Sequence, residues 1–88
     1  MKLQEVCEIC RINQAYLEDL VQYDVITITV PLDQAVFDVV HLDRIKTALR
    51  LQRDLEVNMA SIALIFDLLD ELRDLRTRSD ILERHLLR

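Results

Sequence analysis

The 88-residue sequence contains no glycine, one proline and no tryptophan. Loops that cradle phosphates need glycine where the backbone approaches the ligand, so the usual nucleotide-binding motifs are absent. Ser61 and Ser79 stand within expected helices and lack the surrounding sequence of a nucleophile elbow. We therefore expect a protein that is not an enzyme and uses no cofactor.

Cysteine is also scarce. Cys7 and Cys10 have no second pair to complete a four-ligand zinc site, and His41 and His85 lie far along the chain. The two cysteines are typical of buried or half-buried helix positions, so we expect no metal. A redox pair stays open as an alternative, although its usual βαβ context is missing.

Long apolar runs are missing as well. No run approaches the roughly 20 residues of a membrane span, and the first residues lack the hydrophobic stretch of a signal peptide. We expect a cytoplasmic protein with no membrane partner. A chain of 88 residues suffices for one domain but buries only a modest share of its apolar surface alone, which favours self-association.

Basic residues are absent from residues 12–43, which carry six acids and a net charge of −6 within a chain of net charge −5. Such a surface repels nucleic-acid phosphate and favours a basic protein as partner. We therefore expect no nucleic-acid partner.

Apolar spacings of three and four residues predict a short helix over residues 3–10 and a second helix carrying Leu17, Leu20 and Val21. Asn13 separates them and suits a tight turn, because asparagine tolerates left-handed backbone angles and can cap a helix. The pair predicts a helix-turn-helix.

The segment 25–30 alternates β-branched apolar and polar residues before Pro31, and a second apolar stretch covers residues 35–37. This pattern predicts a small β-hairpin, or wing, against the helix pair. Irregular connectors are the alternative.

Two capping residues introduce the remaining helices. Asp38 is placed to cap a third helix and Asn58 to cap a long final helix that runs nearly to Arg88. The third helix is expected to bury Leu42, Ile45, Ala48 or Leu49, and Leu55. We expect a mainly α fold, with residues 1–57 as a winged helix-turn-helix and residues 58–88 as a helix for packing and dimerisation, together forming one structural unit.

The final helix carries a narrow apolar seam with alternating steps of three and four residues, typical of helices that pair. It comprises Ile65, Leu68, Leu72, Leu75, Ser79, Leu82 and Leu86. We expect a homodimer through Leu68, Leu72, Leu75, Leu82 and Leu86. Packing within one chain is the alternative, since Ile62, Phe66 and Leu69 broaden the first half of the seam.

The order of these parts resembles the DNA-binding domain of the MerR superfamily and, more narrowly, its CbpM branch. The resemblance covers nearly the whole chain and is carried by four segments: the opening residues 3–7, the acidic second helix 16–21, the wing end 36–38, and residues 49–58 with their continuation to Leu72. Glu56 and Val57 stand where MerR relatives often have glycine.

The resemblance implies a modulator that binds the J-domain of a CbpA/DnaJ-like co-chaperone and inhibits its action toward DnaK. J-domains of this family carry a basic helix, and an acidic surface could cover it. The expected partner-binding residues are Glu18, Asp19 and Asp24, with Tyr16 and Tyr23 as aromatic anchors.

Two other functions stay open. A MerR-type transcriptional regulator would bind DNA through Arg11, Arg44, Lys46, Arg50 and Arg53. An antitoxin-like or scaffolding subunit would use similar helical contacts.

Overall fold

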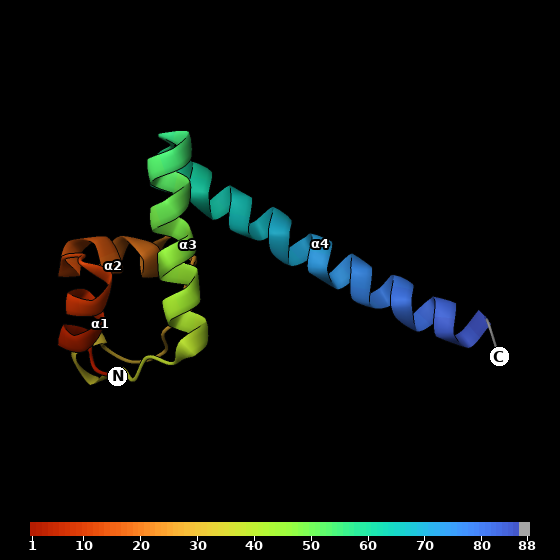
Figure 1. Cartoon of the computed structure of the whole chain (residues 1–88). Coiled ribbons are helices and arrows are strands. Elements are labelled where there is room, and N and C mark those ends of the chain that lie inside the picture. Colours follow the sequence, from red (N-terminus) through yellow and green to blue (C-terminus); the bar gives the residue numbers. More distant parts are fainter. Residues whose placement is uncertain (87–88) are drawn as a thin grey trace.

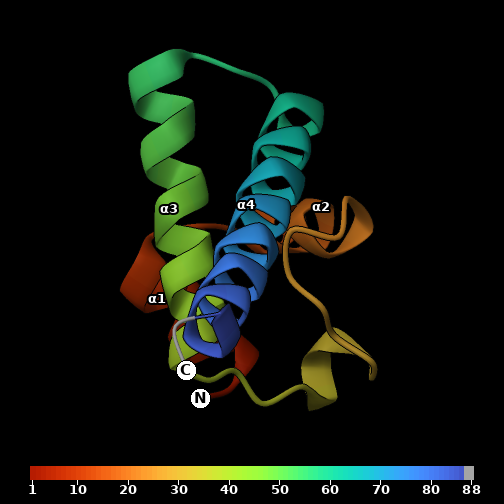
Figure 2. The same cartoon turned by 90° about the vertical axis from the view of Figure 1, so that its right-hand side faces the viewer.

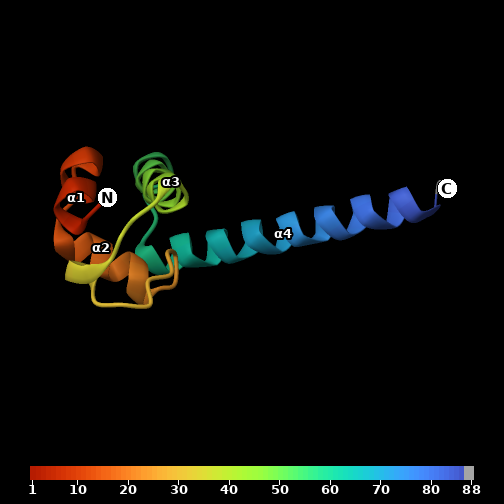
Figure 3. The ribbon, with the colours of Figure 1, turned by 90° about the horizontal axis from the view of Figure 1, so that it is seen from below.

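The computed structural model describes residues 1–86, with side chains through Arg84, and the regular structure in this part of the chain is entirely helical. Three helices gather into a body and a fourth projects from it (Figures 1 and 3), giving extents of 51 × 30 × 20 Å. The elements are α1 (Leu3–Cys10), α2 (Gln14–Gln22), the 3₁₀ helix η1 (Leu32–Gln34), α3 (Val39–Leu55) and α4 (Met59–Leu86).

The structure confirms the predicted helix pair, and two residues between the helices have separate roles. Arg11 adopts left-handed angles with φ 55° and returns its N–H to the carbonyl of Cys7, which closes α1. Asn13 is extended instead, and its side chain accepts the N–H of Tyr16 at 2.8 Å. Asparagine here caps α2, while an arginine makes the turn.

The predicted hairpin is wrong, because its backbone groups are engaged elsewhere. The N–H groups of Val25 and Ile26 both donate to the carbonyl of Leu20, at 2.9 and 3.3 Å, which closes α2. Phe37 pairs with Met1 instead of residues 25–30, donating its N–H at 2.7 Å and accepting from the terminal ammonium at 2.9 Å. Residues 25–37 therefore form an irregular connector, the alternative to the hairpin, and backbone hydrogen bonds hold its two ends.

Side-chain burial in this connector also contradicts a strand. Consecutive residues of a strand face opposite sides of the sheet. Val25 and Ile26 are adjacent in sequence, yet each is only 1% exposed. Ala35 and Phe37 are buried from the other end of the connector, so residues 25–37 fold across the body as a covering loop.

Helix α3 begins as predicted. Asp38 accepts the N–H of His41 at 3.0 Å, and the ring of His41 accepts the N–H of Asp38 at 3.1 Å, which completes a capping box. Ile45 and Ala48 are fully buried and Leu42 and Leu49 half-buried. The expected burial of Leu55 is wrong: this side chain is 55% exposed, because it lies in the last turn of α3, beyond the body.

A short link joins α3 to α4 at the top of Figure 2. Glu56 has φ 52° and donates its N–H to the carbonyl of Gln52 at 2.9 Å. Asn58 then accepts the N–H of Ser61 at 2.9 Å and caps α4, as the sequence predicted. A non-glycine residue thus makes the turn at a position where MerR relatives often have glycine.

The hydrophobic core draws on every helix of the body and on the connector. Helix α4 contributes Ile62 and Phe66 from its first turns. The buried set is Val6, Cys10, Leu17, Leu20, Val25, Ile26, Ala35, Phe37, Ile45, Ala48, Ile62 and Phe66. Helix α4 thus packs against the body at its start, and most of its length projects away from the body.

Candidate partner-binding site

Two of the predicted partner-binding acids lie on the outer face of α2. Leu17 and Leu20 turn into the core, so the intervening Glu18 and Asp19 are exposed to solvent. Tyr23, which is 44% exposed, and Asp24 follow at the C-terminal end of the helix. We call Glu18, Asp19, Tyr23 and Asp24 the acidic edge.

The acidic edge has no cation of its own within the described residues. Among the described residues, the ion pairs of arginine with carboxylate join Asp70 to Arg44 and Asp54 to Arg53, and neither involves the acidic edge. Glu18 accepts a hydrogen bond from the neutral amide of Gln14, at 3.2 Å.

The position of the acids concentrates negative potential. The C-terminal end of a helix carries a partial negative charge, which basic residues usually offset. No basic residue lies in the last turn of α2, and Asp24 adds a carboxylate beyond it. A cation brought to this edge therefore gains from both the side chains and the helix end.

Backbone contacts hold the end of the acidic edge in place. Asp24 adopts left-handed angles with φ 60° and donates its N–H to Val21 at 3.1 Å. The next carbonyl, that of Val25, accepts the Nε–H of Arg44 at 2.6 Å. The edge is anchored to α3 by this contact.

Arg44 is a structural residue that the sequence pattern did not identify. Its guanidinium reaches both oxygens of Asp70 on α4, at 3.2 and 3.3 Å, and lies 4.6 Å from the ring centroid of Phe66. A bidentate pair and a cation–π contact are both favourable at a half-buried site. Arg44 precedes the buried Ala48 by four residues, and this spacing could have indicated that the arginine faces inward.

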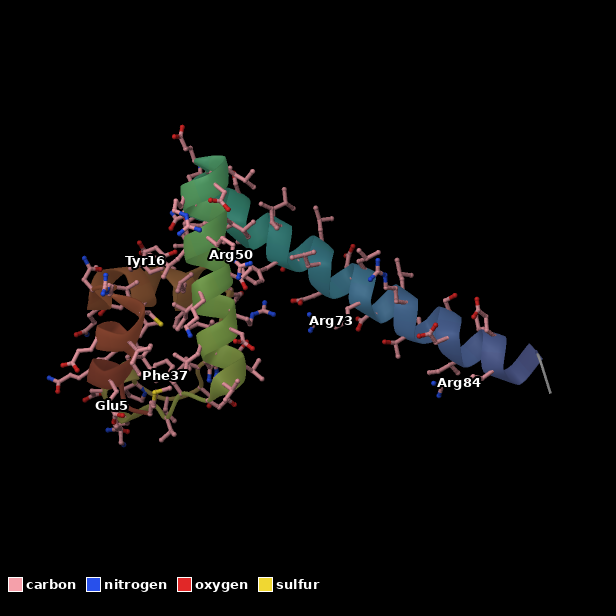
Figure 4. The ribbon with its side chains drawn as sticks, viewed as in Figure 1. Glu5, Tyr16, Phe37, Arg50, Arg73 and Arg84 are labelled. Carbon is pink, nitrogen blue, oxygen red and sulfur yellow. The ribbon has the colours of Figure 1, made fainter. Side chains whose placement is uncertain are left out.

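Tyr16 lies in the contact between α2 and α3 (Figure 4), and its hydroxyl turns toward α3. Its hydroxyl donates to Oε1 of Gln52 at 2.6 Å, and burial raises the pKa of the phenol. These contacts hold α2 against α3. A role as an aromatic anchor for a partner stays a prediction, as it does for Tyr23.

The apolar seam of α4 changes character along the helix. Ile65 is half-buried, whereas Leu68, Leu72, Leu75 and Leu82 are 56%, 46%, 60% and 61% exposed. The predicted contact of Leu86 lies outside the described side chains. The seam is thus an exposed apolar strip, and dimerisation through it remains a prediction.

The thiols and carboxylates show no metal-site geometry in the described part of the chain, where no group of three or more potential ligands is placed to hold a metal. Burial raises the pKa of the Cys7 and Cys10 thiols, which disfavours the reactive thiolates. No helix among the described residues has the length and apolarity needed to cross a membrane.

Residues 1–84 match the sequence model of the MerR HTH family regulatory proteins. The chain therefore belongs to this family. It is also similar to chaperone modulatory protein CbpM of Coxiella burnetii strains Dugway 5J108-111, RSA 331 / Henzerling II and CbuG_Q212, with 50% identity over 48 residues in each. The resemblance to the CbpM branch is confirmed.

The matched segment covers 54% of this chain and 45% of each relative, so the similarity spans less than half the relatives' length. No solved structure matches the chain.

Proposed function

We propose that this protein is a chaperone modulator that binds the J-domain of a CbpA/DnaJ-like co-chaperone and inhibits its stimulation of DnaK. The similarity to CbpM proteins supports the modulator role. The observation that carries the J-domain assignment is the acidic edge, whose carboxylates have no cationic partner among the described residues. The proposed role is cytoplasmic and involves no catalysed reaction.

The chemistry of the acidic edge fits a basic helix. Lysine or arginine side chains on a partner helix would meet Glu18 and Asp19 along α2 and Asp24 at its end. Each exposed pair contributes about 0.2–1 kcal/mol, and several pairs also accelerate association by electrostatic steering. Affinity should therefore fall as salt is raised. A J-domain whose basic helix is covered in this way cannot present that helix to DnaK.

Charge reversal tests the proposal. Titration calorimetry of a CbpA-like J-domain into the protein should show about tenfold weaker binding for Glu18→Lys with Asp19→Lys and Asp24→Lys. A neutral variant, Glu18→Gln with Asp19→Asn and Asp24→Asn, keeps a residue tolerant of left-handed angles at position 24 and should lose less.

The matched control carries the same charge change elsewhere: Asp33→Lys with Asp67→Lys and Asp74→Lys, all at exposed positions. This control should bind nearly as well as the parent. Unchanged affinity in the first variant, or an equal loss in both, contradicts the acidic edge as the J-domain site.

We also propose that two copies pair through α4, at the exposed Leu68, Leu72, Leu75 and Leu82 and at the sequence-predicted position Leu86. Leucines that are about half exposed in one chain would be buried against the same strip of a second chain. Leu72→Asp with Leu75→Asp should halve the mass measured by sedimentation equilibrium. A dimer mass equal to that of the parent shows that the strip is wrongly assigned.

A MerR-type DNA-binding regulator is the second candidate, supported by the family match. Of the basic residues it would use, Arg44 is engaged within the chain and Arg53 pairs with the exposed Asp54, which leaves Arg11, Lys46 and Arg50. A gel-shift assay on genomic fragments at low salt separates the two functions. Retention of specific fragments with no affinity for J-domains would favour the regulator.

A further inference from the structure

Four basic residues of α3 lie between its two acids, Asp43 and Asp54. Residues 44–53 contain four bases and no acid, directly after a segment with six acids and no base. Arg44 faces α4, whereas Lys46, Arg50 and Arg53 are exposed. Their spacings of four and three residues place these three on one flank of α3.

An open hollow of about 250 Å³ adjoins this flank, where the end of α1 meets α3. Its lining is apolar at Ile12, Tyr16 and Leu49 and includes Arg11 and Asn13, but no acid. Leu49 lies three residues after Lys46 and four before Arg53, so both bases stand beside it on the helix surface. We call the hollow together with Arg11, Lys46 and Arg53 the basic hollow.

The positions of two bases are supported by their neighbours. Burial raises the pKa of the Cys10 thiol at the end of α1, and the charge of Lys46 partly offsets this rise, in agreement with a lysine on the side of α3 toward α1. Arg53 contacts Asp54 at 3.2 Å, with side chains 76% and 56% exposed. An ion pair so exposed contributes little and can be exchanged for a partner's carboxylate.

We propose that the basic hollow binds an acidic polypeptide segment that inserts one apolar side chain between two carboxylates. The apolar side chain would cover Leu49 and Ile12, and the carboxylates would meet Lys46 and Arg53. This surface is distinct from the acidic edge on the outer face of α2, so the protein would offer opposite charges to two different partner segments.

The helix geometry specifies the spacing in the ligand. Leu49 lies about 4.5 Å along the helix axis from Lys46 and about 6 Å from Arg53. In an extended segment, residues two apart share a face and lie about 6.6 Å apart. The matching pattern is an acid, any residue, an apolar residue, any residue and a second acid.

The charge distribution favours a polypeptide over nucleic acid. The protein carries a net charge of −5, and a duplex extending beyond the hollow would meet acidic surface. A short acidic segment can contact the local bases without that repulsion, and its apolar side chain has a place to bind.

Chemical-shift mapping on the ¹⁵N-labelled full chain tests the inference. The probe is the end-blocked peptide Glu-Ser-Leu-Ser-Glu, and the comparison peptides are Lys-Ser-Leu-Ser-Lys and Glu-Ser-Ser-Ser-Glu. We expect the probe to shift the amides of Arg11, Lys46, Leu49 and Arg53 in a saturable manner, and both comparison peptides to bind more weakly.

Two variants with equal charge change provide the control. Lys46→Glu with Arg53→Glu should weaken binding of the probe about tenfold, whereas Arg73→Glu with Arg84→Glu on α4 should leave it nearly unchanged. Lys46→Gln with Arg53→Gln should also weaken binding, and it avoids placing a new acid beside Asp54.

Four results would overturn the inference. The first two are chemical shifts scattered over the surface and equal shifts from the lysine peptide. The third is tighter binding of a short DNA duplex at the same residues. The fourth is a change of self-association in the Lys46→Glu, Arg53→Glu variant, which would identify a second copy of the chain as the occupant. None of these measurements uses a J-domain, so they are independent of the proposed modulator function.

Discussion

The body of the protein and the outer part of α4 differ in where their apolar side chains lie. In the body, formed by α1–α3, the connector and α4 through Asp70, Phe37 is 2% exposed and Ile62 fully buried. In the outer part, residues 71–86, Leu75 and Leu82 are 60% and 61% exposed. Figure 4 shows Phe37 within the body and Arg84 far out on the isolated helix.

This difference separates two sources of stability. An apolar residue of the body is covered by its own chain, so its burial contributes to the folding of a single molecule. A leucine of the outer helix can be covered only by another molecule. Changes in the body should therefore act at any protein concentration, and changes in the outer part only where molecules associate.

The largest expected effect is in the core. Phe37→Ala should lower the free energy of unfolding by about 3–5 kcal/mol, because the lost ring leaves a cavity between the connector and the body. Leu82→Ala should change it by less than about 0.5 kcal/mol at concentrations too low for association. Urea denaturation followed by circular dichroism measures both, and similar losses would show that the two regions do not differ.

The junction of the two regions should show an intermediate effect. Arg44→Met removes the forked pair with Asp70 and the bond to the carbonyl of Val25, and should cost about 1–3 kcal/mol. Arg44→Lys should recover only part of this, because an ammonium cannot form the same fork. Full recovery by lysine in urea denaturation would mean that charge alone matters.

A smaller gain is expected where α3 meets α4. Glu56→Gly should raise the free energy of unfolding by about 0.5–1 kcal/mol, because glycine adopts the observed φ of 52° without steric cost. Asp54→Gly is the matched control, since Asp54 is helical, and should lower the free energy of unfolding by about 0.3 kcal/mol, the difference in helix propensity between aspartate and glycine. If both glycines destabilise alike, the left-handed turn is absent in solution.

The smallest effect concerns the cap of α3. The hydrogen bond from the N–H of His41 lowers the pKa of Asp38. The contribution of this carboxylate is therefore present above its ordinary pKa and is lost as the pH falls through the lowered value. The Asp38→Asn variant keeps a hydrogen-bond acceptor at the cap but has no carboxyl group that titrates there. Its free energy of unfolding, measured by urea denaturation, should therefore decline less from pH 5 to about pH 2 than that of the parent protein. Identical declines would exclude this contribution.

Local sequence patterns predicted the helices and their caps. Asn13, Asp38 and Asn58 each accept the expected N–H three residues on, because capping depends on neighbouring backbone groups. The helical spacing of Leu17 and Leu20 likewise indicated that Glu18 and Asp19, which lie between them, are exposed. The caps and the exposed acids of the candidate site were thus accessible without tertiary structure.

Long-range contacts decided the rest. The alternation of residues 25–30 predicted a strand, but the burial of Val25 and Ile26 against the body and the pairing of Phe37 with Met1 replaced the hairpin. In the sequence Arg44 resembles a surface base, whereas in the structure it contacts Val25, Phe66 and Asp70.

By itself the sequence determined the helical periodicity, the capping residues and the negative charge of residues 12–43, since each depends on residues close along the chain. The tertiary structure decided the path of the connector, the inward role of Arg44, and the point at which α4 leaves the body. It also formed the basic hollow. These features join residues far apart in sequence, and which of those residues meet is set by the packing of the whole core.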